Sequence, residues 1–155
     1  MKRLLLYLLV IGASLMIPER GTDAGKLQPV EVVFLYKDEG AIVLETDTGD
    51  MGRGESLEAA YIDLEDTTPG TLFLDTAQYL LVARSVRTLA PKMKAYMKDN
   101  VLVCQAEKGM DLVLAAQYLT VHSPEKQLSD LGNSDNLSVL RREKLGEKII
   151  LKICN

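Results

Sequence analysis

Hydrophobic and polar positions follow one another in short runs that predict a small α/β domain. One stretch in the middle of the chain, residues 71–82 (TLFLDTAQYLLV), opens after Pro69 and Gly70, a strong turn signal. Its ends are apolar and its middle is polar. We interpret it as the central strand of the sheet, with its apolar ends, including Phe73, in the core.

Further strands and helices are predicted on both sides of this stretch. Runs of apolar and β-branched residues predict further strands over residues 29–37, 41–46, 101–106 and 148–154. Apolar residues at helical spacing predict helices over residues 56–65, 85–98 and 112–121, one turn over 128–131 and a weak helix over 137–144. Residues 47–55 and 132–136 are expected to be loops, and a turn at residues 38–40 is expected to make a hairpin.

This order predicts an α/β (α+β) fold, a mixed sheet of about four to five strands with about three helices packed on it. Ser56 and Asp111 stand where helix N-caps are favoured. The helix after Asp111 is apolar over most of its circumference and is expected to be well buried. Pro91 lies inside the predicted helix over residues 85–98, where it favours a kink or a restart.

The N-terminal residues have the pattern of a membrane-directed segment. Lys2 and Arg3 precede residues 4–17 (LLLYLLVIGASLMI), which carry no charge. Spanning a bilayer takes roughly 20 apolar residues, so this run suits a signal peptide or a minimal signal anchor. We expect residues 1–24 to be this segment with its linker, and residues 25–155 to be one domain.

Two fates of this segment remain open. Ala13 and Ala24 are small residues that could precede a cleavage site, which would release a secreted domain. Residues 10–13 have the shape of a lipoprotein box, but Ala13 stands where lipidation needs a cysteine. Without cleavage, residues 4–17 themselves would hold the protein on the membrane, and Lys2 and Arg3 would place the domain on the extracytoplasmic face.

The composition of the chain argues against nucleic acid as a partner. The chain has 155 residues, a formal net charge of −4 and no tryptophan. A net negative charge gives no basic field for nucleic acid, and an aromatic platform for stacking bases is not expected. Hydrophobic residues make up 47% of the chain, which is typical of a globular domain and argues against general disorder.

The acidic, glycine-rich loop over residues 47–54 carries the main candidate binding site. Asp47 and Asp50 could offer oxygen ligands to a hard cation, and Gly52 and Gly54 could help to cradle a phosphate at the start of the next helix. The spacing matches neither the EF-hand loop nor the Walker motif. A flexible surface connection is the simpler interpretation, and both alternatives stay open.

No catalytic constellation emerges from the remaining reactive residues. His122, the one histidine, follows a predicted helix, where it would interact with the helix dipole. Cys104 lies in a predicted buried strand, and it could pair with Cys154 in an oxidising compartment. Asp75, in the polar middle of residues 71–82, could be a buried carboxylate or mark a strand end. We therefore expect no enzyme activity, no metal and no cofactor.

Four segments resemble, in order and spacing, the N-terminal domain of the Ger(x)C family, the lipoprotein C subunits of spore nutrient-germinant receptors. Residues 54–60 (GESLEAA) resemble the opening of that family's helix, and residues 72–75 (LFLD) resemble its LFL strand. Residues 101–109 and 129–131 are similar to later pieces of the same domain. The resemblance covers about residues 27–140.

The resemblance implies a non-enzymatic receptor or assembly component on the outer face of the cell or spore inner membrane. Its partners would be proteins of a germinant-receptor-like complex, and its role would lie in spore germination. The chain departs from the family at Ala13, in place of the lipidated cysteine, and at Asp75 and Thr76, in place of Gly-His. The alternative function is an exported small-ligand or ion-binding module that uses residues 47–54.

Overall fold

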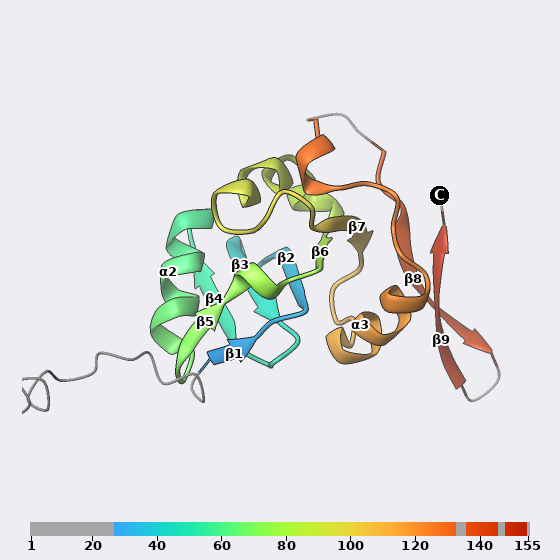
Figure 1. Ribbon diagram of the computed structural model, residues 1–155, viewed down its shortest axis with the longest axis horizontal. Helices are drawn as coiled ribbons and strands as arrows, with labels where there is room; N and C mark the ends of the chain where they lie inside the picture. Colours follow the sequence, from blue (N-terminus) through green and yellow to red (C-terminus); the bar gives the residue numbers. More distant parts are fainter. Residues whose placement is uncertain (1–26, 133–135, 146–147, 155) are drawn as a thin grey trace, which may run out of the picture.

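The computed structural model describes residues 27–132, 136–145 and 148–154. The predicted membrane-directed segment over residues 1–24 lies outside this part of the chain. In the described part, the α/β fold with a mixed sheet is confirmed, and the sheet has seven strands in the order β4-β3-β2-β6-β7-β8-β9 (Figure 1).

The centre of the sheet is parallel and its two edges are antiparallel. The parallel strands are β2 (Val32–Asp38), β6 (Tyr79–Val82), β7 (Leu102–Ala106) and β8 (Val139–Leu145). The antiparallel edges are formed by β3 (Ala41–Thr46) with β4 (Met51–Gly54), and by β9 (Lys148–Cys154) beside β8. The predicted strands over residues 41–46 and 148–154 are confirmed to the residue.

Helical layers cover both faces of the sheet, as Figure 1 shows. One face packs against α2 (Leu57–Thr67) and the 3₁₀-helices η3 (Arg84–Ala95) and η4 (Leu128–Asp130). The other face packs against α3 (Leu112–Val121). Successive residues of the central strands serve opposite layers, since Leu80 belongs to the first core and Leu81 to the second. A continuous apolar run is therefore expected for such a strand.

Both predicted N-caps are confirmed. The Ser56 hydroxyl accepts a 3.1 Å hydrogen bond from the N–H of Ala59, and an Asp111 carboxylate oxygen accepts a 3.0 Å bond from the N–H of Leu114. Each side chain satisfies one of the N–H groups that a helix start leaves without a partner. The predicted hairpin at residues 38–40 is also confirmed, with Gly40 at φ 93°.

Residues 71–82 form two short strands and not one. β5 (Thr71–Phe73) pairs in parallel with β1 (Leu27–Pro29) in a separate small sheet, and the turn η2 (Leu74–Thr76) leads into β6. The Thr76 hydroxyl accepts a 3.0 Å bond from the N–H of Val30 and holds this turn. The polar middle of the stretch is thus a turn, and Phe73 is 38% exposed and outside the core.

The expected loop over residues 47–55 contains the edge strand β4. Gly52 and Gly54 let α2 approach this strand closely. A Cβ on Gly52 would lie 2.2 Å from the carbonyl oxygen of Ala60, and one on Gly54 would lie 2.5 Å from the Ala60 nitrogen. The two glycines therefore serve helix–strand packing.

The predicted helix over residues 85–98 is present as η3, a twelve-residue 3₁₀-helix with Pro91 inside it. Another helix prediction is wrong. The expected weak helix over residues 137–144 is the strand β8, whose partners are β7 and β9. Its charged side chains Arg141, Arg142 and Glu143 are exposed.

Candidate functional site

Asp47 and Asp50, the two carboxylates considered as cation ligands, both accept hydrogen bonds from within the protein. One Asp47 oxygen accepts hydrogen bonds from the N–H groups of Glu31 (3.0 Å) and Val32 (3.1 Å). An Asp50 oxygen accepts a 2.7 Å bond from the Thr48 hydroxyl. Within the described ranges, no three His, Cys, Asp or Glu side chains gather where they could hold a metal ion.

Gly52 and Gly54, the glycines considered for a phosphate cradle, pack closely against α2. The backbone of α2 occupies the positions in front of both glycines, as the short distances to Ala60 show. A phosphate needs free N–H groups at a helix N-terminus and room to approach them. Close packing against α2 therefore accounts for both glycines without a phosphate.

Cys104 and Cys154 do not pair. Both are free thiols, and β8 separates the two strands that carry them. Neighbouring strands lie about 4.8 Å apart, so two steps across the sheet exceed the roughly 7 Å Cα separation that a disulfide tolerates. Cys104 is fully buried in the core, and this burial raises the pKa of its thiol to about 12.

His122, the one histidine, lies at the C-terminal end of α3. It is the C-cap residue, its N–H donates a 2.9 Å bond to the carbonyl oxygen of Tyr118, and the two rings stack with centroids 4.5 Å apart. No hydrogen bond joins its imidazole to a serine or cysteine in the part of the chain that the structure describes. These contacts give it a role in ending the helix.

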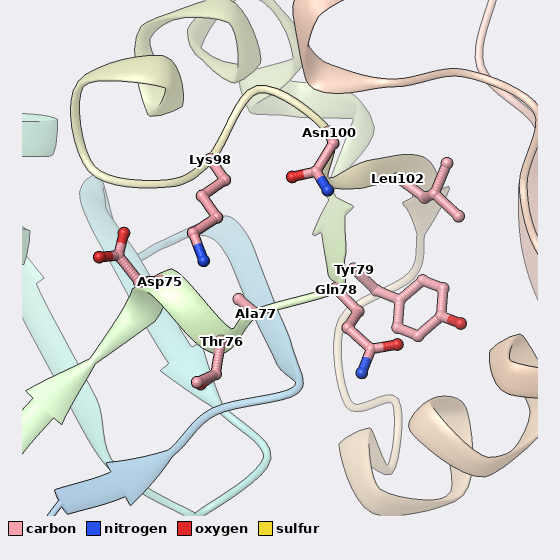
Figure 2. Close-up of a pocket in the computed structure, with 8 residues that line it drawn as sticks. All are labelled: Asp75, Thr76, Ala77, Gln78, Tyr79, Lys98, Asn100 and Leu102. Atoms are coloured by element: carbon pink, nitrogen blue, oxygen red, sulfur yellow. The ribbon is translucent and has the colours of Figure 1, made fainter.

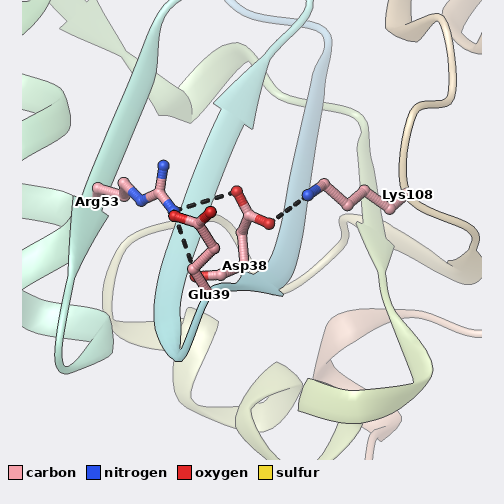
Figure 3. A network of polar contacts seen from close by, with 4 residues as sticks. All are labelled: Asp38, Glu39, Arg53 and Lys108. Carbon is pink, nitrogen blue, oxygen red and sulfur yellow. Dashed lines mark hydrogen bonds and ion pairs between the residues drawn. The ribbon is translucent and has the colours of Figure 1, made fainter.

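A charged network lies at the hairpin between β2 and β3 (Figure 3). Asp38 accepts from Arg53 at 3.1 Å and from Lys108, and Arg53 also pairs with Glu39 at 3.4 Å. The hydrogen bond from Lys108, with the charges of Lys108 and Arg53, lowers the pKa of Asp38. The network lies at the surface. It connects β4 and the segment after β7 to the end of β2.

A second group of charged side chains lines a hollow of about 390 Å³ at the carboxyl ends of β6 and β7. Arg84, Lys108 and Arg141 contribute to its wall, with Glu107 as the acidic member. Open α/β sheets often bind ligands at this edge. Lys108 already forms an ion pair with Asp38, so part of this positive charge is neutralised within the protein.

The helix α3 was expected to be well buried, but it presents several apolar side chains to solvent. Val113 is 54% exposed, Leu114 39% and Val121 75%. Beside them, Ile150 of β9 is exposed, and a hollow of about 440 Å³ lies between Leu114 and Ile150. We call Val113, Leu114, Gln117, Val121 and Ile150 the α3–β9 face.

A hollow of about 570 Å³, which we call the polar hollow after its charged and amide side chains, lies at the amino ends of β6 and β7. It opens between η2 with the start of β6 and the segment that leads into β7 (Figure 2). Asp75 and Lys98 supply opposite charges, and Gln78 and Asn100 supply amides. None of these four side chains has a hydrogen-bond or ion-pair partner among the described residues.

The sequence pointed to one member of this polar hollow and missed the rest. Asp75 was a candidate because of its place between apolar runs, but Lys98 and Asn100 follow η3 and lie more than twenty positions away. Only the parallel pairing of β6 with β7 brings the two segments together. Asp75 also lies close enough to Tyr61 that, after burial and the contact with Glu65, it helps to raise the pKa of Tyr61 to about 12.

Comparison with known proteins adds no relative. The chain matches no protein-family model, no curated protein and no solved structure. Among the described residues, none of the helices has the length and apolar character needed to cross a membrane.

Proposed function

We propose that this protein is a non-enzymatic interaction domain of a membrane assembly, similar to the N-terminal domain of spore germinant-receptor C subunits. The α3–β9 face is the observation that carries the proposal. Three apolar residues of a ten-residue helix face solvent there. Contiguous apolar surface of this kind marks interaction sites in soluble domains.

The occupant that fits this face is an apolar helix of a membrane-embedded partner protein. Val113, Gln117 and Val121 follow one another at four-residue spacing, so they form an inclined row along one side of α3. The hollow between Leu114 and Ile150 continues this row toward β9. A second helix can lay its side chains into such a groove.

The chemistry of α3 favours a protein over a lipid surface. The helix has no charged residue between Leu112 and Val121. Helices that lie on membranes usually carry lysine or arginine along their polar border, and α3 carries neither. A polar side chain, Gln117, stands in the middle of the row, where a partner helix can offer it a hydrogen bond.

The proposed location follows from the N-terminal pattern. Residues 4–17 would hold the protein at the cell or spore inner membrane, with the domain on the extracytoplasmic face. Fractionation with intact-mass measurement tests this part. The proposal expects the full mass in the membrane fraction; a shorter protein in the soluble fraction would show that the segment is cleaved and the domain secreted.

A genetic experiment tests the function itself. The gene is deleted in its native host, and spores are scored for their response to nutrients. Deletion should slow nutrient-triggered germination, and the wild-type gene should restore it. Spores that germinate normally without the gene would exclude the proposed role.

The same host separates the α3–β9 face from the rest of the protein. A gene carrying Leu114→Asp and Val121→Asp should produce normal amounts of protein but leave the germination defect in place. Glu125→Ser, a change of an exposed residue outside the face, is the matched control and should restore germination. Equal restoration by both genes would contradict the assignment of this face.

A further inference from the structure

The polar hollow between η2 and the segment before β7 holds an unusual set of side chains. Asp75 and Lys98 carry opposite charges, and both line the same space of about 570 Å³ (Figure 2). They make no ion pair with each other, nor with any other described residue. Two opposite charges that share a hollow without pairing leave room for a ligand between them.

We propose that this hollow binds a small zwitterion, an amino acid or a short peptide. Asp75 would accept hydrogen bonds from the ammonium group of the ligand, and Lys98 would donate to its carboxylate. Charge-assisted hydrogen bonds of this type are roughly twice as strong as neutral ones. The site is separate from the α3–β9 face, and the proposal does not depend on the function assigned to that face.

The other walls suit the same class of ligand. Gln78 and Asn100 each offer an amide that can donate and accept, and neither is used within the described part of the protein. Ala77 and Leu102 add apolar wall that a ligand side chain can contact. The volume falls within the roughly 300–1,000 Å³ range of small-molecule sites.

The charges also exclude simpler ligands. A phosphate or another anion would meet the Asp75 carboxylate as well as Lys98. A metal ion would find one carboxylate beside an ammonium, and no three metal-ligating side chains gather in the described ranges. A ligand with both charges pairs with Asp75 and Lys98 together, so the site favours zwitterions over ligands that carry one charge.

The test uses the full-length protein and thermal unfolding. The probes are the twenty common L-amino acids and glycylglycine, each at millimolar concentration. At least one should raise the Tm in a concentration-dependent way, because a ligand of the folded state stabilises it. Its methyl ester and its N-acetyl derivative, which lack one charge each, should give no shift.

Variants then assign the two charges. Asp75→Asn and Lys98→Met should each raise the Kd of that probe by about tenfold or more, because each removes one charged hydrogen bond. Both residues are exposed, so the variants should fold. The controls are Asp66→Asn and Lys92→Met, exposed changes outside the hollow, which should bind as the wild type does.

Three outcomes would overturn the proposal. The first is that no probe changes the Tm. The second is that the Asp75→Asn and Lys98→Met variants bind as tightly as the wild type. The third is that the ester or the N-acetyl derivative binds as well as the zwitterion, which would show that only one charge is recognised.

Discussion

The phenolic hydroxyl of Tyr79 on β6 donates a 3.1 Å hydrogen bond to the carbonyl oxygen of Leu119 in α3. Both residues are buried, and Tyr79 also lines the polar hollow. The same carbonyl accepts a 3.2 Å bond from the hydroxyl of Ser123. The last carbonyl groups of a helix have no partner within it, so these two side chains cap the end of α3.

We expect the two donors to substitute for each other in part. Tyr79→Phe and Ser123→Ala should each lower the free energy of unfolding by about 1 kcal/mol. The double variant should lose more free energy of unfolding than the two single variants lose together, because it leaves a buried carbonyl with no donor. Urea unfolding of the four proteins measures this coupling. Strict additivity would show that the two bonds do not share one acceptor in solution.

Glycine substitutions in residues 47–54 test the close packing of β4 against α2. Gly52→Ala places a Cβ against the backbone of α2 and should cost about 3 kcal/mol or more, the upper end of overpacking costs. Gly49→Ala has open space around it, and its positive φ of 91° should cost only about 1–2 kcal/mol. Thermal unfolding compares the two. If both variants lose the same stability, the close contact between β4 and α2 does not exist.

The pKa of Asp38 should depend on Lys108. The folded-state pKa is lower than the ordinary 3.8, first because Lys108 donates a hydrogen bond to it. A depressed carboxyl pKa stabilises the folded state above the unfolded pKa, and this contribution is lost as the pH falls through the folded pKa, in the range below about 4. Lys108→Met should move the Asp38 pKa upward.

Carboxyl-carbon NMR titration of the wild type and the variant reads this shift directly. Lys92→Met changes an exposed lysine that has no contact with Asp38, and it serves as the control. An Asp38 pKa that is the same in all three proteins would show that the contact with Lys108 is not populated in solution.

The two cysteines should react differently with iodoacetamide. At about pH 8 the buried Cys104 is almost entirely protonated, because its pKa is raised to about 12, and only the thiolate reacts. Native protein should therefore be modified at the half-buried Cys154, and protein in concentrated guanidinium chloride at both. Peptide mass spectrometry reads the sites. A disulfide-linked peptide pair from unreduced protein would contradict the separation of the two strands by β8.

Much of the fold follows from local pattern, and the failures have tertiary causes. The strand β3, the strand β9 and the N-caps Ser56 and Asp111 were all predicted, because apolar alternation and capping act within a few residues. β4 was missed because Met51–Gly54 pairs through its backbone and carries almost no apolar side chain. The break at η2 depends on Thr76 reaching Val30, which lies 46 positions earlier.

The candidate sites were harder to predict than the strands. The glycines at 52 and 54 have a packing role that only the position of α2 reveals. The apolar circumference of α3 predicted that the helix is buried. However, α3 is the single helix that packs on its face of the sheet in the described residues, so its outer side faces solvent unless a partner covers it. Lys98 joins Asp75 only through the pairing of β6 with β7.

Site-specific photocrosslinking in membranes of the native host tests the interaction role most directly. A photoreactive amino acid is placed at Leu114 on the α3–β9 face, and at Glu58, an exposed position on α2, as the control. The account predicts a cross-link from position 114 to one integral membrane protein, none from position 58, and loss of the first when Val121→Asp is added. Equal cross-linking from both positions, or a product that contains only two copies of this chain, would contradict it.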